Sequence, residues 1–106
     1  MMTIALAARA AILGAALWAG AAHAQTVSID NFTFTPAVLT VAPGDTVTWT
    51  NADDIPHTVT ATDHSFRSRP LDTNDRFSQT FATPGKYVYF CSIHPHMTGT
   101  IIVKAP

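Results

Sequence analysis

The chain has 106 residues, a length that suits one domain. Its 6 Lys and Arg residues face 7 Asp and Glu residues, which gives a formal net charge of −1. This balance gives nucleic acid and anionic membranes no electrostatic reason to bind. The single cysteine, Cys91, excludes an internal disulfide.

The N-terminal 24 residues have the layout of a secretory signal peptide. A positive charge at Arg9 precedes an almost wholly apolar run at residues 10–22, and small residues then flank His23. The apolar run is shorter than the ~20 residues that a membrane-spanning helix needs. We therefore predict a signal peptide over 1–24, cleaved before Gln25, and a mature domain over 25–106. The expected location is periplasmic or secreted, with no stable membrane insertion after cleavage.

The rest of the chain is dominated by an alternation of apolar and polar residues with a period of two, which is typical of half-buried β-strands. Val47 and Trp49 share one face of their segment, for example, and threonines occupy the other. The same parity places His57 on the inner face with Val59 and Ala61. We expect strands at 27–29, 38–41, 46–50, 57–61, 76–81, 86–91 and 100–104.

Turn signals separate these strands, and no segment has a sustained helical period. Pro43-Gly44-Asp45 and Pro84-Gly85-Lys86 are compact turns that directly precede expected strands. Short strands at such close spacing predict an all-β fold, either an antiparallel sandwich or a barrel. Residues 62–75 are the least regular part, and we expect them to form a loop or to carry a short strand.

The segment with the most chemistry runs from Tyr87 to Met97. Cys91, His94 and Met97 offer a thiolate, an imidazole and a thioether at intervals of three residues. An expected strand delivers Cys91 to the end of the core, and the two-residue spacers allow the chain to curl until the three side chains converge. A lone cysteine in an exported protein needs an explanation, and a bound metal ion provides one.

Three ligands from one loop leave room for a fourth. His57 is the best candidate, because it begins an expected strand, faces inward by parity and follows Pro56, which fixes the approach of the chain. His64 is an alternative in an irregular polar loop. His96 is an alternative to His94, although it adjoins Met97 and competes with it for space.

The type of ligand selects the metal. Structural zinc prefers several cysteines together with histidines, and a lone cysteine with a methionine is a poor zinc set. Two imidazoles and a thiolate in one plane, with a weak axial thioether, describe a blue-copper electron-transfer site. We therefore predict one copper ion per chain, as Cu(I) or Cu(II), bound by His57, Cys91, His94 and Met97.

The chain resembles the cupredoxins, the type 1 blue copper proteins, and is most similar among them to the amicyanins, with plastocyanins and pseudoazurins close to these. The matching segments are 43–51, Pro56-His57, 84–89 and Cys91-x-x-His94-Pro95-x-Met97. The resemblance implies an antiparallel Greek-key β-sandwich, a type 1 copper site and ligand roles for His57, Cys91, His94 and Met97. Many relatives have asparagine or serine after the first histidine, where Thr58 stands here; its hydroxyl is expected to brace the copper loop in part.

The function implied is a periplasmic or exported electron carrier that shuttles single electrons. We expect a monomer whose partners are redox proteins, such as a dehydrogenase, a cytochrome or an oxidase, and no enzyme activity, because about 82 residues leave little room for a substrate cleft. The alternative is a copper carrier or copper-tolerance protein that uses the same site. Arg67 and Arg69 form the only basic pair, interpreted as a solvated loop or, as a second reading, a docking patch.

Overall fold

The computed structural model describes residues 22–106, and this part of the chain contains strands and no helix. The expected signal peptide at 1–24 lies almost entirely outside the described residues. No helix within 22–106 is long and apolar enough to cross a membrane. The strands are β1 (Ala24–Asp30), β2 (Thr33–Thr35), β3 (Val38–Val41), β4 (Asp45–Asn51), β5 (Thr60–Ala61), β6 (Arg76–Phe81), β7 (Gly85–Cys91) and β8 (His94–Val103).

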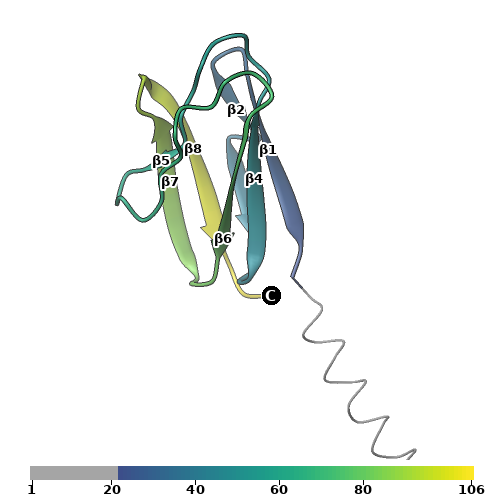
Figure 1. Ribbon diagram of the computed structural model, residues 1–106. Helices are drawn as coiled ribbons and strands as arrows, with labels where there is room; N and C mark the ends of the chain where they lie inside the picture. The colour runs from purple at the N-terminus through teal and green to yellow at the C-terminus, as the bar shows by residue number, and fades with distance from the viewer. Residues whose placement is uncertain (1–21) are drawn as a thin grey trace, which may run out of the picture.

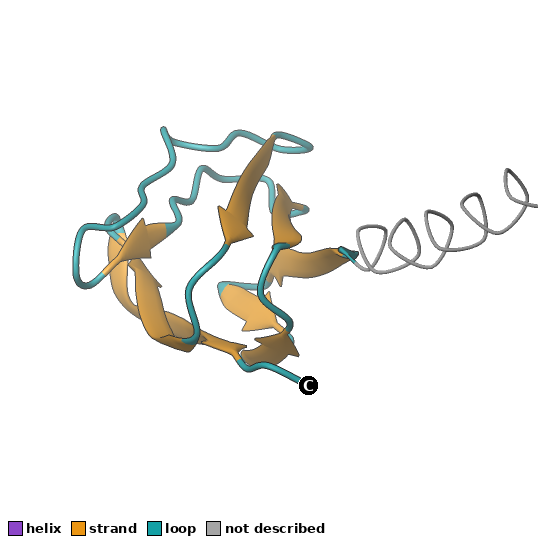
Figure 2. Cartoon of the chain, turned by 90° about the horizontal axis from the view of Figure 1, so that it is seen from below, coloured by secondary structure: helices purple, strands orange, loops and turns teal. Residues whose placement is uncertain are grey.

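The strands form two four-stranded sheets that face each other, so the predicted β-sandwich is confirmed (Figures 1 and 2). One sheet has the order β2-β1-β4-β6 and the other β3-β8-β7-β5. The sheets are mixed, because β1 pairs with β4 and β3 pairs with β8 in parallel. An all-antiparallel arrangement is not formed, since the chain crosses to the second sheet after β2 and returns in β4 beside β1.

The segment expected as a strand at 57–61 is regular only at Thr60 and Ala61. The expected alternation of inward and outward residues is absent there, because all five residues are buried. Residues 66–68 pair with the edge of this segment, with Ala61 N donating to Phe66 O at 3.0 Å and Ser68 N to Val59 O at 2.8 Å. The region 62–75 is otherwise a loop that makes isolated bridges, one of them between His57 and Leu71.

The core between the sheets is aromatic at its centre. Trp49 is fully buried, and the rings of Phe66, Phe77, Phe81 and Tyr89 lie 5.3–6.4 Å from it, centroid to centroid. The strict alternation in β4 puts Trp49 there, since every second residue of this strand is buried. Burial of each such side chain contributes roughly 1.5–3 kcal/mol to folding.

Gly99 in β8 allows Tyr89 in β7 to lie flat against the neighbouring strand. The two residues are paired across the ladder, and a Cβ atom on Gly99 would lie 2.3 Å from the Tyr89 ring. The hydroxyl of Tyr89 is buried with no hydrogen-bond partner among residues 22–106, and burial raises the pKa of Tyr89 to about 12. A side chain larger than hydrogen at position 99 therefore has no space.

One end of the sandwich collects the chemically active residues. β4 ends at Asn51, β7 ends at Cys91 and β8 begins at His94. The β1–β2 turn, at Asn31 and Phe32, lies at the same end, since the amides of both residues bind Asp53 beyond β4. The predicted ligands thus come from β7, from β8 and from the loop after β4, which meet at this end of the sandwich.

Candidate metal centre

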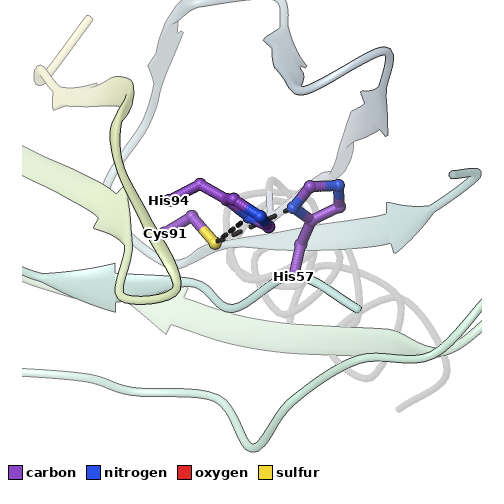
Figure 3. Close-up of side chains that lie close together, drawn as sticks. All are labelled: His57, Cys91 and His94. Carbon is purple, nitrogen blue, oxygen red and sulfur yellow. Dashed lines mark hydrogen bonds between the residues drawn. The ribbon is translucent and has the colours of Figure 1, made fainter. Parts of the chain in front are cut away.

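Three of the four predicted ligands converge on one point (Figure 3). The Sγ atom of Cys91 lies 3.8 Å from Nδ1 of His57 and 3.6 Å from Nδ1 of His94. The three ligand atoms lie within 4.8 Å of one another. Cys91 and His57 are fully buried and His94 is half-buried, so the cluster sits just beneath the surface.

Cys91 and His94 come from the two strands of one hairpin. Cys91 is the last residue of β7, His94 is the first of β8, and the two are paired across the ladder. The expected curl after Cys91 is therefore a tight turn at Ser92 and Ile93. A register shift between Phe90 and Cys91 ends the regular ladder at this point and aims both side chains into the site.

His57 comes from a loop, and long-range contacts hold its backbone. His57 N donates to Leu71 O at 3.1 Å, and Leu71 N donates to His57 O at 2.8 Å. The buried amide of Asn51 fixes the same loop, because its Nδ2 donates to the carbonyl oxygens of Ile55 and Leu71, each at 2.8 Å. Its Oδ1 accepts a hydrogen bond from the amide of Asp53 at 2.9 Å.

Asp53 binds the ring of His57 and was not expected to do so from the sequence. Its Oδ2 lies 2.7 Å from Nε2 of His57. Since a carboxylate can only accept, His57 donates from Nε2 and keeps Nδ1 free as a ligand. The carboxylate also accepts hydrogen bonds from the amides of Phe32 and Asn31, at 3.0 and 2.7 Å. The Phe32 amide is the largest cause that lowers the pKa of Asp53 to about 2.

Phe32 covers the two imidazoles and also escaped the sequence analysis. Its ring meets the rings of His57 and His94 edge to face, with centroids 5.3 and 5.0 Å apart. Asn31 and Phe32 both have positive φ, 52° and 56°, a conformation that a phenylalanine rarely adopts. The two amide bonds to Asp53 hold this turn in place, so one carboxylate orients a ligand and its aromatic cover.

Thr58 joins the His57 loop to the Cys91 hairpin. Its amide donates to Sγ of Cys91 at 3.3 Å, a bond that stabilises a thiolate. Its hydroxyl accepts from the amide of Ser92 at 2.7 Å and lies 2.8 Å from the Ser92 hydroxyl. These contacts are the bracing that was expected of the Thr58 hydroxyl.

The remaining candidate ligands, Met97, His64 and His96, differ in burial and in distance from the cluster. Met97 is 3% exposed and belongs to the same cluster of buried residues as Cys91. His64 and His96 are exposed and are not members of the three-residue cluster. The geometry therefore favours His94 over His96, and His57 over His64.

The donor set fits copper. The two Nδ1···Sγ separations, 3.8 and 3.6 Å, leave room for one ion between the atoms. Metal–nitrogen and metal–sulfur bonds of about 2.0 and 2.3 Å would span these separations at angles of about 115–125°, close to those of a trigonal set. A single buried thiol with two imidazoles also matches the soft and intermediate ligands that copper prefers.

Comparisons with known proteins agree with this geometry. A family model described as a cupredoxin-like domain matches residues 2–103. An amicyanin of Paracoccus versutus is 32% identical, covering 78% of this chain and 67% of its own, and amicyanin-alpha of Methylorubrum extorquens is 33% identical, covering 85% and 87%. The solved purple cupredoxin of Nitrosopumilus maritimus superposes with a TM-score of 0.73 at 35% identity, over 76% of this chain and 99% of its own. The chain therefore belongs to the cupredoxin family, is most like the amicyanins, and binds one copper ion.

Proposed function

We propose that this chain is an exported, monomeric electron carrier with a type 1 copper site formed by His57, Cys91, His94 and Met97. The observation that carries the proposal is the convergence of two imidazole nitrogens on one buried sulfur, at 3.8 and 3.6 Å. This is the donor set of blue-copper electron-transfer sites, in which copper supplies a one-electron couple.

Met97 is proposed as the weak axial ligand. It follows His94 by three positions in β8 and is buried with Cys91 in one apolar cluster. A thioether is a soft and weak ligand, so it suits a long axial bond and favours the reduced state. The apolar surroundings of Met97 also exclude water from that side of the site.

Contacts among the described residues hold the ligands in place. The hairpin ladder fixes Cys91 and His94, and Asn51 and Asp53 fix His57. Thr58 ties the two groups together. A site that cannot rearrange between oxidation states presents a low barrier to electron exchange, so this rigidity supports an electron carrier.

The half-buried ring of His94 provides the shortest way in and out for an electron. Two exposed apolar side chains, Phe32 at 46% and Ile93 at 50% exposed, lie beside it. A small apolar patch around an imidazole suits the small interfaces of transient redox encounters. The proposed partners are redox proteins, such as a dehydrogenase, a cytochrome or an oxidase.

The burial of the site favours electron transfer over copper delivery. A copper-handling protein must let the ion enter and leave, whereas His57 and Cys91 are 0% exposed. His96 would be the natural relay for a moving ion, but it lies outside the ligand cluster.

The experiment starts with copper-loaded protein and its visible spectrum. We expect an intense thiolate-to-copper band at about 600 nm, which Cys91→Ala abolishes and the matched control His64→Ala retains. Copper should resist a mild competing chelator while electron self-exchange, measured by line broadening in mixed oxidation states, stays fast. A colourless copper form would contradict the site. A blue form that loses copper readily and exchanges electrons slowly would indicate copper handling instead.

A further inference from the structure

A pocket of about 480 Å³ lies next to the Cys91–His94 hairpin and shares Ile93 with the apolar patch around His94. Thr58, Ser92, Arg67 and Arg69 are among the residues that line it. No Asp or Glu is among the residues of the described chain that line it. We call this feature the arginine pocket.

The two arginines are placed by a fixed backbone. Phe66 and Ser68 are buried and Arg67 and Arg69 are exposed, so alternate side chains of this segment point outward. Ser68 anchors the segment, because its amide donates to Val59 O at 2.8 Å and its hydroxyl accepts from Val59 N at 2.9 Å. The positive charges are therefore held at one place instead of being carried on a free loop.

The charge of the pocket contrasts with that of the whole chain, which is slightly acidic. Arg67 has no ion pair among residues 22–106, and Arg69 makes only a long contact of 3.8 Å with Asp75, with 66% of its side chain exposed. Such an exposed pair contributes little, so both guanidinium groups can bind an incoming anion. Guanidinium groups favour carboxylates because they bind them through two parallel hydrogen bonds.

The pocket also lies one residue from the proposed copper ligand. Thr58, which lines it, donates its amide to Sγ of Cys91 at 3.3 Å, and Ser92 is the next residue after Cys91. A partner seated here would have a short covalent and hydrogen-bonded route to the thiolate. This route is separate from the one through the imidazole of His94.

We infer that the arginine pocket docks carboxylate side chains of an acidic redox-partner protein, placing that partner beside Cys91. The inference rests on the proposed electron-carrier function and names the chemistry of the partner. Charge complementarity carries it: two fixed arginines and no acidic group line a pocket that borders the redox centre. Electrostatic steering of this kind raises association rates and weakens with salt.

The first test locates the anion site without electron transfer. Hexacyanochromate(III), a paramagnetic and redox-inert trianion, is added to the diamagnetic Cu(I) protein, and amide signals are followed by NMR. We expect broadening at Thr60, Ser68 and Ser92 that Arg67→Glu/Arg69→Glu removes. The matched control Lys86→Glu/Lys104→Glu introduces the same charge change at the opposite end of the sheet and should leave the broadening in place. Broadening elsewhere, or equal loss in both variants, would overturn the inference.

The second test distinguishes a protein carboxylate from a free oxyanion. A hexaglutamate peptide should relieve the broadening at a free concentration at which sulfate, at matched ionic strength, does not. Displacement by sulfate at the same concentration as the peptide would assign the pocket to small oxyanions and overturn the docking role.

The third test measures electron transfer at low ionic strength. Oxidation of the Cu(I) protein by hexacyanoferrate(III) should slow at least about tenfold in Arg67→Glu/Arg69→Glu relative to the lysine control. Arg67→Gln/Arg69→Gln should fall between these, and the visible band should be unchanged in all three. Equal slowing in both charge-reversal variants would mean that only net charge acts, which contradicts the inference. If the parent protein exchanges electrons with neither this anion nor a cationic cobalt(III) reagent, the proposed electron-carrier function is wrong. The NMR experiment then still decides whether the arginine pocket binds anions.

Discussion

The two parts of the chain that supply the proposed copper ligands are built in different ways. Cys91 and His94 belong to the β7–β8 hairpin, where the backbone ladder fixes their positions through local pairing. His57 belongs to a loop that the side chains of Asn51 and Asp53 hold from outside. The backbone ladder thus secures Cys91 and His94, which we call the backbone arm of the site, whereas polar side chains secure His57, which we call the polar arm and which single substitutions can disrupt.

Removal of Asn51 should have the largest effect on the polar arm. Asn51→Ala leaves the carbonyl oxygen of Ile55 and the amide of Asp53 without their partner and removes one of the two donors to Leu71 O, which keeps His57 N, so the free energy of unfolding should fall by about 3 kcal/mol. Urea denaturation of the apo protein measures this loss. Ser78→Ala on exposed β6 is the control and should change stability by less than about 0.5 kcal/mol. Equal small losses in both variants would show that the Asn51 network does not secure the loop.

Overpacking at Gly99 should damage the backbone arm instead. Gly99→Ala places a methyl group against the Tyr89 ring, where there is no room for it, so stability should fall by about 2 kcal/mol. The visible band of the folded copper form should remain. Thr98→Ala, at the exposed neighbouring position, is the control. If Gly99→Ala is as stable as the parent in thermal melting, the close approach of β7 and β8 is wrong.

Removal of the Asp53 side chain should weaken copper binding by freeing the ring of His57. Asp53→Ala removes the acceptor of His57 Nε2 and frees the ring, so copper affinity should fall about 10- to 100-fold. Competition with a chelator of known affinity measures it. Asp54→Ala, its exposed neighbour, should leave the affinity unchanged. An unaltered copper affinity in Asp53→Ala would show that Asp53 does not orient His57 for copper binding.

The smallest expected effect is a pH dependence of stability caused by Asp45, at the end of β4 that lies far from the ligands. Asp45 accepts hydrogen bonds from the amides of Ala42 and His23; the Ala42 bond is the larger cause that lowers its pKa below the ordinary 3.8, and it is kept in a chain cleaved before Gln25. A lowered pKa contributes stability that is present above pH 3.8 and is lost as the pH falls through the folded value. The apo protein should therefore lose stability on acidification in this range, and Asp45→Asn should flatten the dependence. A dependence that is identical in Asp45→Asn and the parent would contradict the assignment.

The same contrast explains how far the sequence could predict the molecule. Cys91, His94 and Met97 lie within seven residues, and period-two alternation predicted most strands, so the hairpin arm follows from local pattern. The partners of His57 do not: Asp53 meets Asn31 and Phe32 across more than twenty residues, and no local pattern reports such a contact. Parity correctly placed His57 inward, but it missed that Thr58 and Thr60 are buried as well. The short β2 strand and the parallel pairings depend on crossovers between sheets, which alternation does not encode.

The most direct test of the site is a crystal structure of the copper-loaded protein with anomalous data at the copper edge. The account predicts one copper peak per chain between Nδ1 of His57, Sγ of Cys91 and Nδ1 of His94, with the Met97 sulfur facing the ion from farther away. A peak at His64 or His96, or a copper ion bound without the Cys91 sulfur, would contradict it.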